Sequence, residues 1–248
     1  MILIKTPEEI QKIRESSIIL ANLMKELSKM VEPGVVTKDL DSFAEDFILK
    51  AGAKPGFKGY NGFPAALCIS INDEIVHGIP SKRVLKEGGI VSIDAGVFYN
   101  DFHSDVAITL PIGEIDPEIK RLIKATRKAL KRGIKKSKVG NTFGDVSNSI
   151  QRYIEGQGFG IVKNLCGHGI GRGLHEDPEI LNYGKRGAGA NIKEGMCFCL
   201  EPMLSIGISG EIEQDKNGIY RTKDGSLSAH SEHLIAIVNG KPEVLTEI

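Results

Sequence analysis

IVSIDAGVFYNDFHSD, residues 90–105, contains an apolar, β-branched run, a polar turn and the beginning of a second run. Residues 90–97 and 106–110 have the composition of buried strands, so the stretch predicts a hairpin. A hairpin that is symmetric about this turn would place Asp94 directly opposite Asp105. Like charges in that arrangement are destabilising, and a buried carboxylate without a partner costs more. We therefore predict that the two acids hold a cation between them.

The composition is that of a globular protein. The chain has 248 residues, 41% of them hydrophobic, and its 32 basic and 32 acidic residues give a formal net charge of zero. This suits one domain over residues 1–248, or two small fused lobes, of α/β or α+β class. A neutral chain has no overall field to attract DNA or a membrane. The basic segment 120–138 is interpreted as a solvated helix face, with a nucleic-acid contact as the alternative.

The N-terminus and the cysteines indicate a compartment. MILIKTPEEIQKIRES is too charged for a secretory signal, and no apolar run approaches the length of a membrane span. The four cysteines form neither a CxxC pair nor a disulfide framework. We therefore expect a cytoplasmic protein with reduced thiols. Its neutral, ordinary surface indicates a monomer.

The first half of the chain predicts two helices. Thr6-Pro7-Glu8-Glu9 has the pattern of a capping box, so a helix begins there and runs to about Met30. Thr37 is expected to cap a second helix, which ends before Gly52. Further strands are expected at residues 67–71, 75–79, 196–204 and 233–238.

The second half repeats this pattern. A helix that begins at Asp116-Pro117 ends before Gly140, and the next helix ends by Gly158. An offset of 106 residues superposes Gly34 on Gly140 and Gly52 on Gly158. The repeat indicates two related α/β halves with a site between them. Chance similarity between amphipathic helices is the alternative.

A glycine-rich segment, residues 166–175, carries His168 and His175. Glycines let a backbone approach a ligand closely, so one of these histidines is a candidate ligand. A surface loop with incidental histidines is the alternative. No strand–turn–helix unit surrounds the segment, so it is not a nucleotide-binding fingerprint.

Two acids and a histidine occupy notable positions elsewhere. Glu201 lies inside the apolar run MCFCLEPML, where a glutamate is rarely buried unpaired. Pro202 beside it indicates an edge or a bulge. Glu232 precedes an apolar strand, and His77 lies in EIVHGIP. Taken alone, Glu232 is typical of a solvated strand end and His77 of a hydrogen-bonded structural histidine.

Together these residues form a specific set. Asp94, Asp105, His168, Glu201 and Glu232 supply four carboxylates and one imidazole. Structural zinc sites prefer Cys and His, so four carboxylates are too many for one. They suit two divalent ions about 3.5–4 Å apart with shared carboxylate ligands, as in two-metal hydrolases.

The motifs VHGIP, SIDAGVFYNDFHSD, GHGIGRGLHEDP, FCLEPM and SLSAHSEH resemble, in order and spacing, the type I methionine aminopeptidases. The resemblance covers essentially the whole chain and is to the short bacterial form. It implies the pita-bread α/β (α+β) fold, with a curved antiparallel sheet, flanking helix pairs and pseudo-twofold halves. It also implies two divalent ions (Co, Mn, Fe or Zn) and removal of the initiator methionine from nascent polypeptides, before a small second residue. Proximity to the ribosome follows, with the basic segment 120–138 as a candidate contact.

The resemblance assigns roles to the acids. Asp94 would chelate one metal, Asp105 and Glu232 would bridge both, and His168 and Glu201 would complete the shell of the other. Glu201 would also act as general base towards the water and then as general acid towards the leaving amine.

The resemblance also implies a substrate site. His77 and His175 match two non-ligand histidines that position the peptide and stabilise the oxyanion. The methionine pocket is expected from Tyr60, Phe63 and Cys68, with Phe57 nearby. The chain departs from the family pattern at several places: Phe57 and Phe63 stand where some relatives have Cys and Tyr, His230 and Ser231 stand where relatives carry Gln or Tyr, and there is no tryptophan.

Two other functions fit parts of this pattern. A pita-bread hydrolase that cleaves before proline would use the same metal ligands, but such relatives usually carry a large N-terminal domain. A non-catalytic peptide- or nucleic-acid-binding relative would have lost metal ligands, whereas this chain has all five candidates and both histidines.

Overall fold

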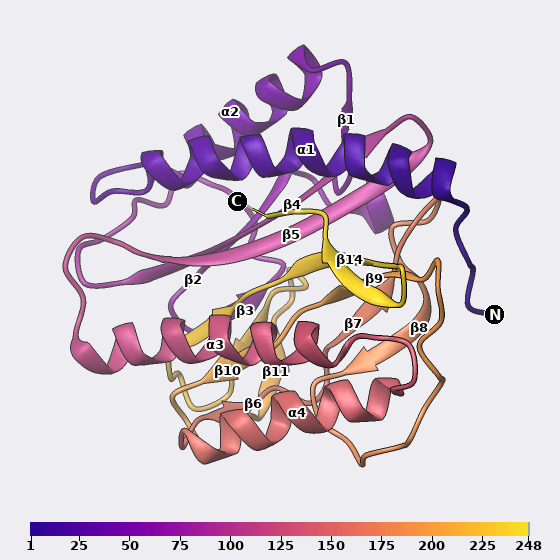
Figure 1. The fold of residues 1–248 in the computed structure, drawn as a ribbon. Coiled ribbons are helices and arrows are strands. Elements are labelled where there is room, and N and C mark those ends of the chain that lie inside the picture. The colour runs from indigo at the N-terminus through magenta and orange to yellow at the C-terminus, as the bar shows by residue number, and fades with distance from the viewer. Residues whose placement is uncertain (248) are drawn as a thin grey trace.

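The computed structural model describes residues 1–247 and shows two pairs of helices with strands between them (Figure 1). α1 and α2 lie on one side of the strands, and α3 and α4 lie on the other. No helix in the described residues is both long enough and apolar enough to cross a membrane. The helices are α1 (Pro7–Met30), α2 (Thr37–Lys50), α3 (Pro117–Lys136) and α4 (Phe143–Gly156), with a 3₁₀ turn η1 (Tyr60–Gly62).

The start of α1 agrees with the sequence prediction, and the start of α2 differs from it. At α1 the Thr6 side chain accepts a hydrogen bond from the Glu9 N–H, and the Glu9 carboxylate accepts one from the Thr6 N–H, which confirms the capping box. The prediction that Thr37 caps α2 is wrong, since Thr37 is the first helical residue. Its hydroxyl instead bonds the backbone N–H and C=O of Ser81, which ties the helix to a neighbouring loop.

The predicted repeat is confirmed in the bounds of the elements. α2 and α4 differ by 106 residues at both ends. Gly34 and Gly140 have φ of 96° and 93°, and Gly52 and Gly158 have φ of 74° and 77°. These are left-handed conformations that glycine adopts without steric cost, so the glycines end equivalent turns. The basic residues of the second half lie on the exposed face of α3, as the solvated-face interpretation predicts.

The paired strands of the described residues are antiparallel and form four hydrogen-bonded sheets. One sheet contains β1 (Lys54–Pro55), β2 (Leu67–Ile71), β4 (Ile90–Tyr99) and β5 (Phe102–Pro111). The largest contains β7 (Cys166–Gly169), β8 (Glu176–Leu181), β9 (Cys197–Leu200), β14 (His233–Val238) and β15 (Lys241–Val244). The two smaller sheets contain β6 (Gly160–Ile161), β10 (Met203–Ser205) and β13 (Ser228–His230), and β3 (Glu74–Val76), β11 (Ile212–Gln214) and β12 (Tyr220–Thr222).

Two predicted strands are shorter than expected. The strand predicted at 196–204 is broken into β9 and β10 at Glu201-Pro202, because proline has no N–H to donate to a ladder. The strand predicted at 75–79 ends at Val76, since His77 has a φ of 63° and turns the chain. Both interruptions fall at candidate site residues, which frees their side chains from the regular alternation of a strand.

The β4–β5 hairpin has a different register from the predicted one. The predicted register assumed a turn centred within residues 98–101. In the structure Asn100 and Asp101, with φ of 49° and 70°, form a two-residue turn between Tyr99 and Phe102. Asp94 therefore pairs with Ala107, and Asp105 pairs with Gly96. The prediction that the two acids are directly opposite is wrong. Because side chains alternate with a period of two, a shift of two residues leaves both acids on one face, as diagonal neighbours.

The buried carboxylate of Asp41 offers a test of how the first half is held together. It accepts hydrogen bonds from the N–H groups of Ala66 (2.8 Å) and Leu67 (3.0 Å), at the start of β2. Asp41→Ala would leave two buried donors unsatisfied, so we expect the free energy of unfolding to fall by about 3 kcal/mol in urea denaturation. Asp39→Ala, an exposed change in the same helix, should cost less than about 1 kcal/mol. Equal effects would contradict this account.

Candidate metal centre

The five predicted metal ligands come together. Asp94 and Asp105 lie on the hairpin, His168 on β7, Glu201 directly after β9, and Glu232 directly before β14. Oxygen atoms of Asp94, Asp105 and Glu232 lie within 4.8 Å of one another. The Nε2 atom of His168 is 3.9 Å from Asp105 Oδ2 and 3.6 Å from Glu201 Oε1. Residues from both halves of the chain therefore build one cluster.

Backbone contacts to β5 place Glu232 in this cluster. The Glu232 N–H donates to the Ala107 carbonyl at 2.8 Å. Two residues farther along β5, the Thr109 hydroxyl accepts from the His230 N–H at 2.8 Å and donates to the His230 carbonyl at 2.7 Å. The segment that connects β13 to β14 is thus docked on the strand that carries Asp105.

His168 is held in the form that binds metals. Its Nδ1–H donates to the Gly169 carbonyl at 2.9 Å, which leaves the unprotonated Nε2 facing Asp105 and Glu201. Burial lowers the pKa of His168 to about 3, so the imidazole is neutral at physiological pH. A neutral imidazole whose other nitrogen is hydrogen-bonded is the usual form of a histidine ligand.

The four acids share a strongly unfavourable environment for negative charge. Burial raises the pKa of Asp94 to about 7 and raises the pKa of each of Asp105, Glu201 and Glu232 well above its usual value. Repulsion among the acids adds to this effect. Among residues 1–247, no lysine or arginine forms an ion pair with any of the four.

The donor atoms fit divalent cations. One carboxylate oxygen of each of Asp94, Asp105 and Glu232 is buried without a hydrogen-bond partner. Several oxygens and one neutral imidazole form a set that binds Mn, Fe, Co or Zn, and bound cations would offset the repulsion. The residues present therefore fit the metal centre that the sequence predicts.

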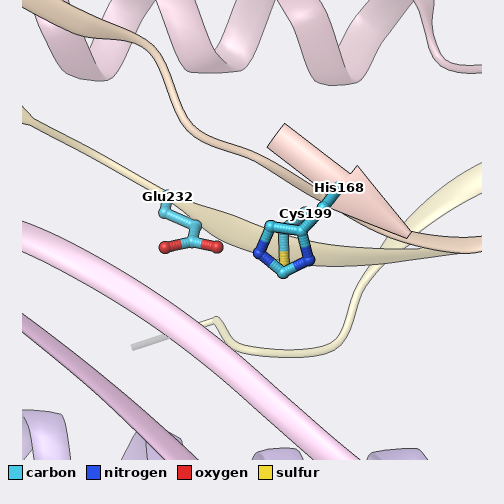
Figure 2. Close-up of side chains that lie close together, drawn as sticks. All are labelled: His168, Cys199 and Glu232. Atoms are coloured by element: carbon cyan, nitrogen blue, oxygen red, sulfur yellow. The ribbon is translucent and has the colours of Figure 1, made fainter. Parts of the chain in front are cut away.

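Sequence reasoning missed Cys199 as part of this cluster. Figure 2 shows the side chains of His168 and Glu232 converging near the Cys199 thiol, and the three donor atoms lie within 4.8 Å of one another. Burial raises the pKa of the thiol well above its usual value, so it stays protonated. Cys199 precedes Glu201 by two residues in the same apolar run, and that alternation was the available signal.

A cavity of about 950 Å³ contains the cluster. It is lined by every residue that the sequence assigns to the site: Phe57, Tyr60, Phe63, Cys68, His77, Asp94, Asp105, His168, His175, Glu201 and Glu232. Residues that the sequence did not identify also line it, among them Leu174, Gln214 and Gly218. The structure thus places the predicted acid cluster and the predicted substrate pocket in one continuous space.

Two neutral histidines lie beside the acids. The Tyr60 hydroxyl is 2.9 Å from His175 Nδ1, and the His175 ring lies edge to face with His168, with centroids 4.3 Å apart. His77 has a positive φ, which is strained for a residue with a side chain, and its ring contacts that of Tyr220. Partial burial lowers the pKa of both His77 and His175, so each is a neutral donor or acceptor at pH 7.

The apolar wall of the cavity depends on a glycine. Phe57 and Cys68 belong to one buried cluster, against which Tyr60 and Phe63 pack. A Cβ atom at Gly96 would lie 2.7 Å from Cε1 of Phe57. Real Cβ atoms do not approach that closely, so Gly96 allows the Phe57 ring to lie against β4. The hairpin therefore positions both an acid and the aromatic wall.

The chain is similar to known proteins over nearly its whole length. The family model of metallopeptidase family M24 matches residues 11–239. The chain belongs to metallopeptidase family M24. A methionine aminopeptidase of Clostridium acetobutylicum is 47% identical over 247 residues, which cover 99% of each chain. Methionine aminopeptidase 1 of Bacillus subtilis is 44% identical over the full length of both chains.

Solved structures confirm the fold predicted for this M24 peptidase. The crystal structure of a methionine aminopeptidase from Thermotoga maritima matches it with a TM-score of 0.98 and 42% identity over all of both chains. A prolidase from Pyrococcus furiosus matches with a TM-score of 0.81 and 24% identity, over 99% of this chain and 65% of the prolidase. The M24 peptidase therefore has the pita-bread α/β fold of these enzymes.

The acid cluster predicts how metal binding by the M24 peptidase depends on pH. In the metal-free folded state Asp94 keeps its proton up to a pKa of about 7, whereas the unfolded chain releases it near its ordinary value of about 3.8. Protonated Asp94 thus contributes its full stability to the metal-free protein at pH values below about 3.8. This contribution is lost as the pH rises through about 7. Metal ions compete with the same protons, so they bind more weakly at low pH.

We therefore expect the difference in melting temperature between Mn²⁺-loaded and chelator-treated protein to widen from pH 5 to pH 7.5. Buried histidines that titrate equally in the loaded and the chelator-treated protein affect both melting temperatures alike, so they do not change the difference. Asp94→Asn should make the difference smaller and less dependent on pH. A difference that is constant or narrows with rising pH in the unmutated protein would contradict the account.

Proposed function

We propose that this M24 peptidase releases the N-terminal methionine of nascent polypeptides, preferentially before a small second residue. The observation that carries the proposal is the composition of the cavity. The cavity is lined by four acids, of which Asp105 and Glu232 are buried and Asp94 and Glu201 are half-buried, together with His168. It is also lined by Phe57, Phe63 and the Cys68 thiol, which form an apolar wall. Such a wall suits a thioether side chain. The relatives named methionine aminopeptidase support the same substrate.

The acids would hold two divalent ions of the Mn, Fe, Co or Zn group. In this proposal Asp105 and Glu232 would serve both ions, Asp94 would hold one, and His168 and Glu201 would hold the other. When bound, these ions would polarise the scissile carbonyl and lower the pKa of the attacking water.

Proton transfer falls to Glu201 in this proposal. Its Oε1 faces His168 and its Oε2 faces His230, both at distances too long for hydrogen bonds. Neither histidine therefore holds the carboxylate by a hydrogen bond, and Glu201 would take a proton from the attacking water and deliver it to the leaving amine.

The histidines would hold the substrate carbonyl. If the Tyr60 hydroxyl donates to His175 Nδ1, the proton of the neutral ring must be on Nε2, which can then donate to the developing oxyanion. His77 borders the same cavity and would orient the peptide. The lowered pKa of both rings keeps them in the neutral form that this role requires.

We also propose that the protein acts in the cytoplasm, where nascent chains are made. All four cysteines are free, in accord with a reducing compartment. Cleavage before proline is the competing activity, because a prolidase shares the fold.

A peptide assay separates these two activities. Chelator-treated protein reloaded with Mn²⁺ or Co²⁺ would be given Met-Ala-Ser, Met-Leu-Ser and Ala-Pro-Gly. We expect release of free methionine, faster from Met-Ala-Ser than from Met-Leu-Ser, and no cleavage of Ala-Pro-Gly. Cleavage of the proline peptide alone would replace the proposed function with that of a prolidase-like enzyme. No turnover of any peptide with any divalent ion would support a non-catalytic protein.

Substitution of the two bridging acids tests the ligand assignment. Asp105→Asn or Glu232→Gln would remove a carboxylate from both ions, so kcat/KM for Met-Ala-Ser should fall by more than about 100-fold, beyond the 10–100-fold typical of groups that only support a ligand. Glu179→Gln is the matched control, because this exposed acid lines the same cavity outside the cluster. Near-normal turnover in either bridge variant would overturn the assignment.

A further inference from the structure

His230 is a buried imidazole at the centre for which the resemblance implies no role. The residue ends β13 and is 1% exposed, and both of its ring nitrogens are buried without a hydrogen-bond partner. Its Nε2 lies 3.8 Å from Glu201 Oε2 and 3.9 Å from Glu232 Oε2. The ring is therefore aimed at two of the carboxylates assigned to metal binding.

The position of His230 is set by a buried hydroxyl network. The Thr109 hydroxyl bonds both the N–H and the C=O of His230, and the Ser92 hydroxyl lies 2.7 Å from that of Thr109. Ser92 and Thr109 belong to β4 and β5, the two strands that carry Asp94 and Asp105. The hairpin that supplies two of the acids thus also fixes the backbone that presents the second imidazole.

The distances around His230 are those of neighbouring ligands of one ion. Two donors that each lie about 2.1–2.2 Å from a metal are roughly 3.0–4.0 Å apart for angles of about 90–130° between them. His168 shows a similar spacing, 3.6 Å and 3.9 Å, to its two acids. His168 faces Oε1 of Glu201 and His230 faces Oε2, so the carboxylate lies between two imidazoles.

We propose that His230 is a sixth protein ligand of the metal centre and that its Nε2 binds the same ion as Glu201. The centre then has two imidazoles and four carboxylates. A second nitrogen donor favours later first-row ions such as Co²⁺ and Zn²⁺ over Mn²⁺. The inference rests on the metal centre of the proposed function and does not depend on which peptide is cleaved.

X-ray absorption at the metal edge tests this directly. Metal-free protein loaded with one equivalent of Zn²⁺ or Co²⁺ should show two directly bound imidazoles, and His230→Gln should show one. Glutamine is the chosen replacement because it keeps a polar side chain of similar length. Titration calorimetry should show Zn²⁺ binding weakened by at least about 10-fold in the variant.

His233→Gln is the matched control. That histidine is also largely buried, but its Nδ1 contacts the Thr246 hydroxyl at 3.0 Å, away from the acids. Its substitution should leave both the imidazole count and the Zn²⁺ affinity unchanged.

Fewer than two imidazoles in the unmutated protein would overturn the proposal, whether or not any variant folds. An unchanged count in His230→Gln would do the same. Failure of the proposed function would look different, because a protein that binds Zn²⁺ through two imidazoles could still leave Met-Ala-Ser intact.

Discussion

Repulsion among four crowded, poorly solvated carboxylates is the constraint on which the structure of this M24 peptidase depends. Asp94, Asp105, Glu201 and Glu232 lie on or beside four different strands and meet where burial raises the pKa of each. Such a cluster opposes folding unless protons or cations neutralise it. The surrounding hydrogen bonds hold the acids together against this repulsion, and bound cations would turn the same arrangement into a source of stability.

Both halves of the chain hold the acid cluster in place. Each half has its own buried core beneath its helix pair, one around Leu23 and Ile69 and the other around Val146 and Phe198. A third, smaller core lies at the cavity and contains both Phe57 and Cys199. The acids are therefore mounted on two rigid layers, and the aromatic wall of the substrate pocket is packed against the strands that carry them.

Local patterns predicted most of the scaffold, and the two misses have different causes. The capping box at Thr6 and the left-handed glycines act within a few residues, so the sequence displays them. The register of the hairpin depended on two consecutive left-handed residues at Asn100 and Asp101, which the same pattern could not distinguish from a longer turn. The hydroxyl of Thr37 forms hydrogen bonds with the backbone of Ser81, a residue far away in the sequence, and so does not cap the helix.

The sequence by itself determined which residue types are available for metal binding and catalysis. A carboxylate inside an apolar strand is costly to bury, and a bound cation is the usual reason for its presence there. The sequence therefore pointed to five candidate metal ligands and to the candidate pocket residues, all of which line one cavity. Only the tertiary structure decided which side chains share that space. Cys199 and His230 look ordinary in the sequence, and they join the site because β9, β13 and β14 dock beside the hairpin. Long-range packing sets distances between side chains, and no local pattern carries that information.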